Sequence, residues 1–141
     1  MFNRILVAYD GSELSRKALD KAISLATEQG ASIVAAHVYQ LPVFVIGQGY
    51  ALPNDFLVQM RERARQNVAE AEKLLDRLPN SKAVLLEGVP DKEIVEYAEA
   101  NGIDLIVMGS RGLGAIREMV LGSVSHRVVQ HAKASVLVVK E

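Results

Sequence analysis

Short apolar runs alternate with longer amphipathic patterns along the whole chain, and this alternation restricts the fold more than any single motif does. Runs that are typical of strands occupy residues 5–8, 33–38, 82–86, 105–108 and 136–139, and those at 5–8, 33–38 and 105–108 are typical of strands buried on both faces of a sheet. Helical spacing of apolar residues follows them at residues 13–30, 55–78, 91–100 and 124–132. Strands that alternate with helices build βαβ units around a parallel sheet. The sequence therefore predicts an α/β fold: an open, parallel, five-stranded, Rossmann-like sheet with helices on both faces.

Length and composition narrow the class of protein. The 141 residues fit one domain, so we expect a single domain over residues 1–141. A net charge of −1 gives no basic excess that would indicate nucleic-acid binding, and the absence of cysteine excludes disulfides, thiolate catalysis and cysteine-ligated zinc. No signal-peptide pattern and no apolar run of about 20 residues is present, so we expect a cytoplasmic protein without a membrane span.

A glycine-rich segment follows the predicted strand at residues 105–108. Gly109 and Gly112 allow a ligand to approach the main chain closely, and Gly122 and Ser123 open the last predicted helix. A helix N-terminus presents unpaired N–H groups and the positive end of the helix dipole, both of which favour an anion. We expect Ser123 to be the N-cap, and the hydroxyls of Ser123 and Ser125 to add donors. The pattern predicts a phosphate site, although glycine turns and serine caps also occur without any ligand.

The expected crevice lies where the parallel strands end. Ligands of open α/β sheets bind outside the carboxyl ends of the strands at the point where the strand order reverses. If the first and fourth strands are neighbours, Asp10, Val38 and the glycine-rich segment converge on one crevice. Residues 41–54, from Leu41 to Asn54, contain two prolines and two glycines without a clear period, so we interpret them as a long loop and a candidate lid.

Several catalytic signatures are missing. The chain contains no P-loop G-x4-G-K-[S/T], no dinucleotide fingerprint G-x-G-x-x-G and no nucleophile elbow G-x-S-x-G. We assign no catalytic residue. His126 and His131 are expected on a helix surface, and Asp104, which precedes its strand, at the opposite edge from the crevice. Arg111 and Arg127 suit phosphate by their guanidinium geometry, with simple solvation weighed equally for both.

These segments together resemble the universal stress protein family. The resemblance rests on Val7-Ala8-Tyr9-Asp10-Gly11-Ser12, on His37-Val38, and on the pattern G-x2-G-x9-G-[S/T], which begins at Gly109 and is matched at every fixed position. It implies the strand order 3-2-1-4-5. It also implies binding of ATP, or of ADP or AMP, together with Mg²⁺ or Mn²⁺. Ala8 and Ser135 stand where some members of the family have proline.

The resemblance also implies roles for individual residues. The Val38 backbone would contact adenine, Ala8 would line the base pocket, and Asp10 would bind the ribose together with the Gly109 region. Phosphates would lie against Gly112, Gly122, Ser123 and Ser125. The complete implied site is Ala8, Asp10, Val38, Gly109, Ser110, Arg111, Gly112, Leu113, Gly114, Gly122, Ser123, Val124 and Ser125. We expect a valine at Gly122 to block the approach of phosphate while leaving the fold intact.

The last predicted strand bears on how the protein assembles. Residues 136–139, from Val136 to Val139, would form an apolar edge strand, which favours a homodimer through antiparallel pairing unless loops shield the edge. The leading function is an ATP-binding stress or signalling module with slow or no turnover. The alternatives are a slow ATPase or phosphotransferase and a nucleotide-free dimeric adaptor.

Overall fold

The expected alternation of strands and helices is present in the structure, a computed structural model that describes residues 1–40, 54–112 and 120–141. The five strands are parallel and hydrogen-bonded in the order β3-β2-β1-β4-β5, as the resemblance implied. The elements in chain order are β1 Arg4–Ala8, α1 Glu13–Gln29, β2 Ser32–Tyr39, α3 Asn54–Leu74, β3 Lys82–Glu87, α4 Pro90–Ala100, β4 Leu105–Gly109, α5 Ser123–His131 and β5 Ser135–Val139.

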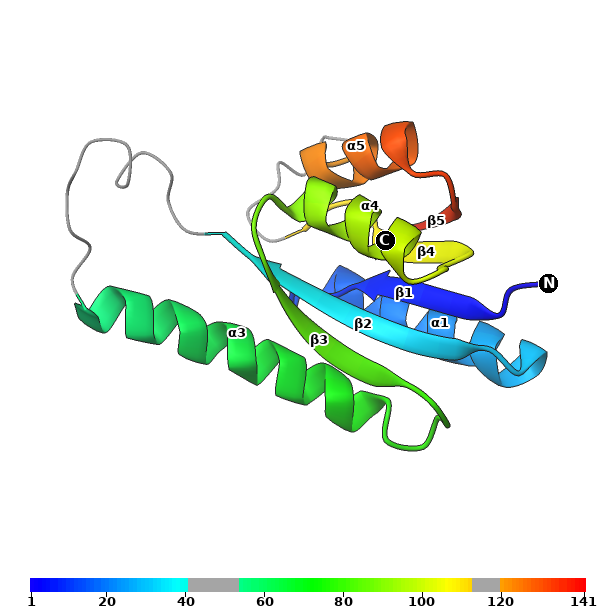
Figure 1. The fold of residues 1–141 in the computed structure, drawn as a ribbon, viewed down its shortest axis with the longest axis horizontal. Coiled ribbons are helices and arrows are strands. Elements are labelled where there is room, and N and C mark those ends of the chain that lie inside the picture. Colours follow the sequence, from blue (N-terminus) through cyan, green and yellow to red (C-terminus); the bar gives the residue numbers. More distant parts are fainter. Residues whose placement is uncertain (41–53, 113–119) are drawn as a thin grey trace.

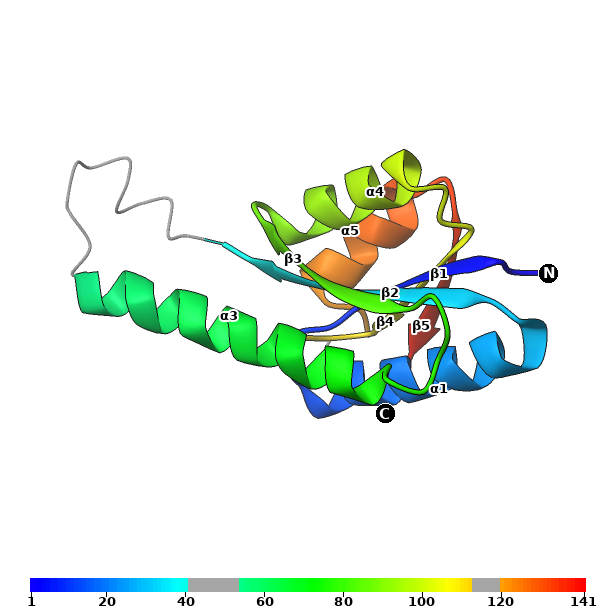
Figure 2. The same ribbon diagram turned by 60° about the horizontal axis from the view of Figure 1, so that its bottom comes forward.

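Helices cover both faces of the sheet. Figures 1 and 2 show α1 and α3 against one face and α4 and α5 against the other. Side chains alternate along a strand, so in β1 Ile5 and Val7 pack toward α1 and α3, whereas Leu6 packs toward α4 and α5. This two-sided burial explains why β1, β2 and β4 are continuous apolar runs rather than alternating ones.

The first helix is fixed at both ends by the residues that the sequence indicated. Ser12 is its N-cap, and the Ser12 hydroxyl accepts from Ser15 N at 3.1 Å. Gly30 ends the helix in the left-handed conformation at φ 70°, which glycine adopts without steric cost. The cap places residues 10–12 at the carboxyl end of β1.

Two predicted helices differ from the structure. The helix expected over residues 55–78 ends at Leu74, and Leu74 is 44% exposed rather than in the apolar stripe. The chain tightens into turns beyond it, where Leu78 N donates to Leu75 O ahead of a proline that disfavours a continued helix. In α5 the expected N-cap Ser123 is the first helical residue and Gly122 is the cap, while Val129, expected on the apolar face, is 46% exposed.

The edges of the sheet are β3 and β5, so the expectation that the last strand lies at an edge is confirmed. No helix among the described residues is long and apolar enough to span a membrane. The proposed lid falls largely on residues 41–53, which lie outside the described residues.

Candidate functional site

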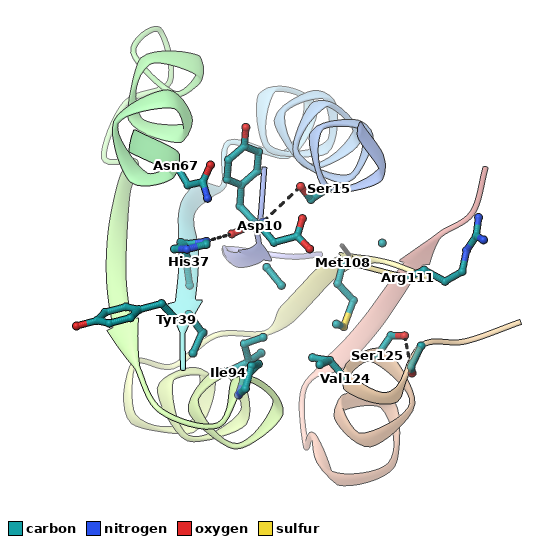
Figure 3. A pocket seen from close by; sticks show the side chains of 18 of the residues that line it. Asp10, Ser15, His37, Tyr39, Asn67, Ile94, Met108, Arg111, Val124 and Ser125 are labelled. Atoms are coloured by element: carbon teal, nitrogen blue, oxygen red, sulfur yellow. Dashed lines mark hydrogen bonds between the residues drawn. The ribbon is translucent and has the colours of Figure 1, made fainter. Parts of the chain in front are cut away.

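A cavity of about 640 Å³ opens at the carboxyl ends of β1, β2 and β4 (Figure 3). Its size is in the range of small-molecule sites. The expected convergence of Asp10, Val38 and the glycine-rich segment is therefore present. Leu113 and Gly114 lie outside the described residues, and Ser110 lies behind the lining. The predicted residues that line the cavity are Ala8, Asp10, Val38, Gly109, Arg111, Gly112, Gly122, Ser123, Val124 and Ser125.

One wall of the cavity is apolar. Figure 3 shows Ile94, Met108 and Val124 directed into it from α4, β4 and α5. Val38 and Ala8 belong to the same packed layer, because their positions in β2 and β1 face α4 and α5. The result is a hydrophobic slot at the end of the sheet, which suits a flat aromatic group.

Asp10 and Gly112 lie close together in the lining of the cavity. The Asp10 carboxylate accepts from Ser12 N through Oδ1 at 2.9 Å, which orients the side chain. A Cβ built on Gly112 would lie 2.7 Å from Asp10 Oδ2, closer than real Cβ contacts. Glycine at position 112 therefore leaves room for the carboxylate at the mouth of the site.

The two ends of the glycine-rich segment meet at the Ser110 carbonyl. Ser110 O accepts from Gly122 N at 2.6 Å and from Ser125 Oγ at 2.7 Å. Ser110 N donates to Val139 O at 2.8 Å, which ties the segment to β5. A Cβ on Gly122 would lie 3.3 Å from Ser110 O and 3.4 Å from Arg111 Cα. A valine at Gly122 would therefore require this backbone to shift by a few tenths of an ångström, and the expectation that the fold stays intact stays a prediction.

The N-terminus of α5 borders the cavity. Gly122 caps the helix without a side-chain hydrogen bond, and the exposed Ser123 and the half-buried Val124 line the cavity directly after it. Free N–H groups of the first turn and the positive helix end make this side of the cavity suitable for an anion. The apolar slot and this polar end belong to one continuous space.

The charged residues and histidines considered from the sequence differ in whether they line the cavity. Arg111 lines the cavity and is paired with Glu141. Arg127 is half exposed, lies 3.8 Å from Asp91 Oδ1 and does not line the cavity. Asp104 accepts from Asn3 N and Arg4 N at the opposite end of the sheet, as predicted. The expected surface positions of His126 and His131 are also confirmed, because both are exposed.

The α3 side of the cavity was not predicted. Asn67 lines it, and a Cβ on Gly11 would lie 2.6 Å from Asn67 Oδ1. His37 Nδ1 lies 2.9 Å from Tyr9 O, and because a carbonyl only accepts, Nδ1 carries a proton in this arrangement. The sequence signal for Asn67 is a polar residue within the inward stripe that holds Ala64 and Ala71.

Tyr9 connects this side of the cavity to two helices. Its hydroxyl donates to Glu70 Oε1 at 2.5 Å, and Arg16 Nε donates to the same oxygen at 2.7 Å. Burial and the bond to Glu70 raise the pKa of Tyr9 to about 12. The bonds from Tyr9 and Arg16 lower the pKa of Glu70, and Glu70 in turn raises the pKa of Arg16. The network links β1, α1 and α3 beside the site.

Comparison with known proteins gives the family. The model of the universal stress protein family matches residues 1–140. The chain belongs to the universal stress protein family. Universal stress protein YxiE of Bacillus subtilis is 36% identical over 148 residues, which cover 99% of this chain and all of YxiE.

Solved structures share the fold of this universal stress protein. The structure of MJ0577, a protein of Methanocaldococcus jannaschii, matches with a TM-score of 0.86 and 30% identity, over 100% of this chain and 97% of that one. A universal stress protein in complex with cAMP matches with a TM-score of 0.74 and 24% identity, over 98% of this chain and 97% of that one.

Proposed function

We propose that this universal stress protein is an adenine-nucleotide-binding module with slow or no turnover, acting in stress response or signalling. One observation carries the proposal: a hydrophobic slot, the Asp10 carboxylate and a helix N-terminus line the same cavity. These three features match the three parts of a nucleotide, namely an apolar base, a hydroxyl-bearing ribose and an anionic phosphate chain.

The proposed orientation follows from the positions of these features. The base enters the slot beside Ala8, Val38 and Ile94, where the Val38 backbone supplies polar contacts to the base edge. Asp10 accepts from the ribose hydroxyls, since an ionised carboxylate is an acceptor and hydroxyls donate. The phosphates then lie toward Gly112 and the α5 N-terminus, with the Ser123 hydroxyl as an added donor. cAMP in the related structure is an adenine nucleotide held by the same fold.

A divalent cation fits this site only as a partner of the phosphates. Among the described residues, no group of three His, Cys, Asp or Glu side chains is arranged to hold a metal ion. Mg²⁺ is commonly bound through substrate phosphates together with one or two carboxylates, and because we assign Asp10 to the ribose, the phosphate oxygens would be the main ligands of the cation here. A bound cation would neutralise phosphate charge.

We assign slow turnover because ATP hydrolysis needs a positioned base or a residue that orients water. Among the described lining residues, Asp10 is the carboxylate, which we assign to the ribose, and His37 is bonded through Nδ1 to Tyr9 O on the α3 side of the cavity. A slow ATPase stays the alternative on the same site. Multiple-turnover phosphate release separates the two activities.

The experiment compares two aspartates in calorimetric titration with ATP and MgCl₂. Asp10→Asn is expected to weaken binding about tenfold or more, equivalent to ~1.4 kcal/mol, because it removes the charged acceptor and retains the shape. Asp104→Asn is the matched control, since Asp104 caps backbone N–H groups at the far end of the sheet. Equal affinities of Asp10→Asn and Asp104→Asn would contradict the proposed site, and absence of binding by the wild type would favour the nucleotide-free adaptor.

A further inference from the structure

Ser125 borders the cavity, but it is almost fully buried and its hydroxyl is already bonded to the backbone. Ser125 is 2% exposed, whereas Ser123, two positions earlier in the same helix, is exposed. The Ser125 hydroxyl lies 2.7 Å from Ser110 O and 3.1 Å from Gly122 O. A serine hydroxyl has one hydrogen, so the bond to a carbonyl uses its only donor. Ser125 would have to leave Ser110 in order to donate to a phosphate.

The acceptor of this bond is the point that closes the glycine-rich segment. Ser110 is itself buried, at 3% exposure, and its carbonyl also accepts from Gly122 N at 2.6 Å. Both acceptor positions of that carbonyl are therefore occupied, by the cap of α5 and by the side chain one turn into α5. Without the Ser125 hydroxyl, Ser110 O would lose one of these two bonds and keep the one from Gly122 N.

The same residue fixes the segment to the sheet. Ser110 N donates to Val139 O of β5 at 2.8 Å, next to the last paired position of β4 with β5. The hydrogen bonds from Ser125 to Ser110 and from Ser110 to Val139 thus set where the first turn of α5 lies relative to the strand ends. Asp10 and Gly112 lie at those same ends. Backbone donors bind a phosphate well only when they are already aimed at it.

We propose that Ser125 is a positioning residue and not a phosphate ligand: its hydroxyl holds the Ser110 carbonyl and thereby aligns the α5 N-terminus for the phosphates. This inference rests on the proposed nucleotide function and departs from the phosphate role that the family resemblance implies for Ser125. Ser123 is then the serine of α5 that contacts the ligand.

The test uses Ser125→Ala, Ser123→Ala and a matched control, Ser81→Ala. Ser81 also bonds the backbone through its hydroxyl, accepting from Ile33 N at 2.9 Å, but it precedes β3 at the far end of the sheet. Each folded variant is titrated with ATP and with adenosine. In the absence of ligand, hydrogen exchange of the Gly122 amide is followed by NMR.

We expect Ser125→Ala to weaken ATP binding about tenfold, to leave adenosine binding unchanged and to accelerate exchange at Gly122 about tenfold, since all three follow from a loosened Ser110 carbonyl. Ser123→Ala is expected to weaken ATP binding without changing exchange, and Ser81→Ala to change neither. A loss of ATP affinity in Ser125→Ala with unchanged Gly122 exchange would show direct ligation and overturn the inference. Unchanged ATP affinity in Ser125→Ala would overturn it as well. Failure of the wild type to bind either ligand would instead overturn the proposed function.

Discussion

The Tyr9 hydroxyl donates to Glu70 Oε1 at 2.5 Å, and this bond joins the end of β1 to the C-terminal part of α3. Tyr9 is 2% exposed, so its ring packs in the core while its hydroxyl reaches the helix surface. Asn67 lies one turn before Glu70 and lines the cavity. The bond therefore helps to hold α3 in place beside the site.

Replacement of Tyr9 by phenylalanine should measure the strength of this link. Tyr9→Phe keeps the buried ring and removes the donor, so we expect the free energy of unfolding to fall by about 1–3 kcal/mol, the usual range for a hydrogen bond to a charged group. Urea denaturation at pH 7 measures the loss. Tyr97→Phe is the control, because no bond from the Tyr97 hydroxyl to a described residue is present; an equal loss in both variants would contradict the link.

The same network predicts a pH dependence with a definite sign. Bonds from Tyr9 and Arg16 lower the pKa of Glu70 in the folded state. A carboxyl group of this kind stabilises the fold above its unfolded pKa, about 4.3, and loses that contribution as the pH falls through its lower folded pKa. We therefore expect the stability difference between wild type and Glu70→Gln to be largest near pH 6–7 and to shrink below pH 4. A difference that grows on acidification would refute the network.

Gly112→Ala should separate binding from folding. The added Cβ meets Asp10 Oδ2, the end of a flexible side chain, at 2.7 Å. The carboxylate can turn away at a small cost in stability, but the turn takes it from the position proposed for ribose. We expect ATP affinity to fall about tenfold, equivalent to ~1.4 kcal/mol, with the melting temperature shifted by only a few degrees. Undiminished affinity in this variant would argue against the assigned role of Asp10.

The edge strand β5 gives a prediction about assembly. Leu137 is 37% exposed on this strand, and we propose that β5 pairs with a second copy of the chain. A charged residue on an edge strand opposes such pairing. Leu137→Lys is therefore expected to convert a dimer to a monomer in light scattering, whereas Leu85→Lys, at the other edge, should leave the dimer intact. A monomeric wild type would exclude β5 pairing.

The sequence revealed the features that depend on neighbouring residues. Apolar runs located all five strands. The three central strands, β1, β2 and β4, are buried on both faces and therefore need continuous apolar side chains. Glycines and serines after β4 indicated one end of the cavity for a similar reason, since their conformational and capping preferences are local. The strand order came from the family resemblance, and the pairing in the structure agrees with it.

Features that depend on contacts between residues far apart in the sequence could not be predicted from local patterns. Tyr9 and Glu70 are 61 positions apart, and Ser110 and Ser125 are 15 apart, so neither pair leaves a periodic signal. The burial of Ser125 depends on where the Ser110 carbonyl lies, which composition does not encode. The early end of α3 at Leu74 likewise follows from turn hydrogen bonds that compete with the helical pattern.

Calorimetric titration of the purified wild-type protein with ATP and MgCl₂ determines whether the cavity holds a nucleotide. Nucleotide released on denaturation is analysed in parallel, so that a site already filled by co-purified nucleotide is not mistaken for one that does not bind. We expect saturable binding of about one nucleotide per chain, with little phosphate release over many hours. Absence of both titratable binding and co-purified nucleotide would contradict the proposed function.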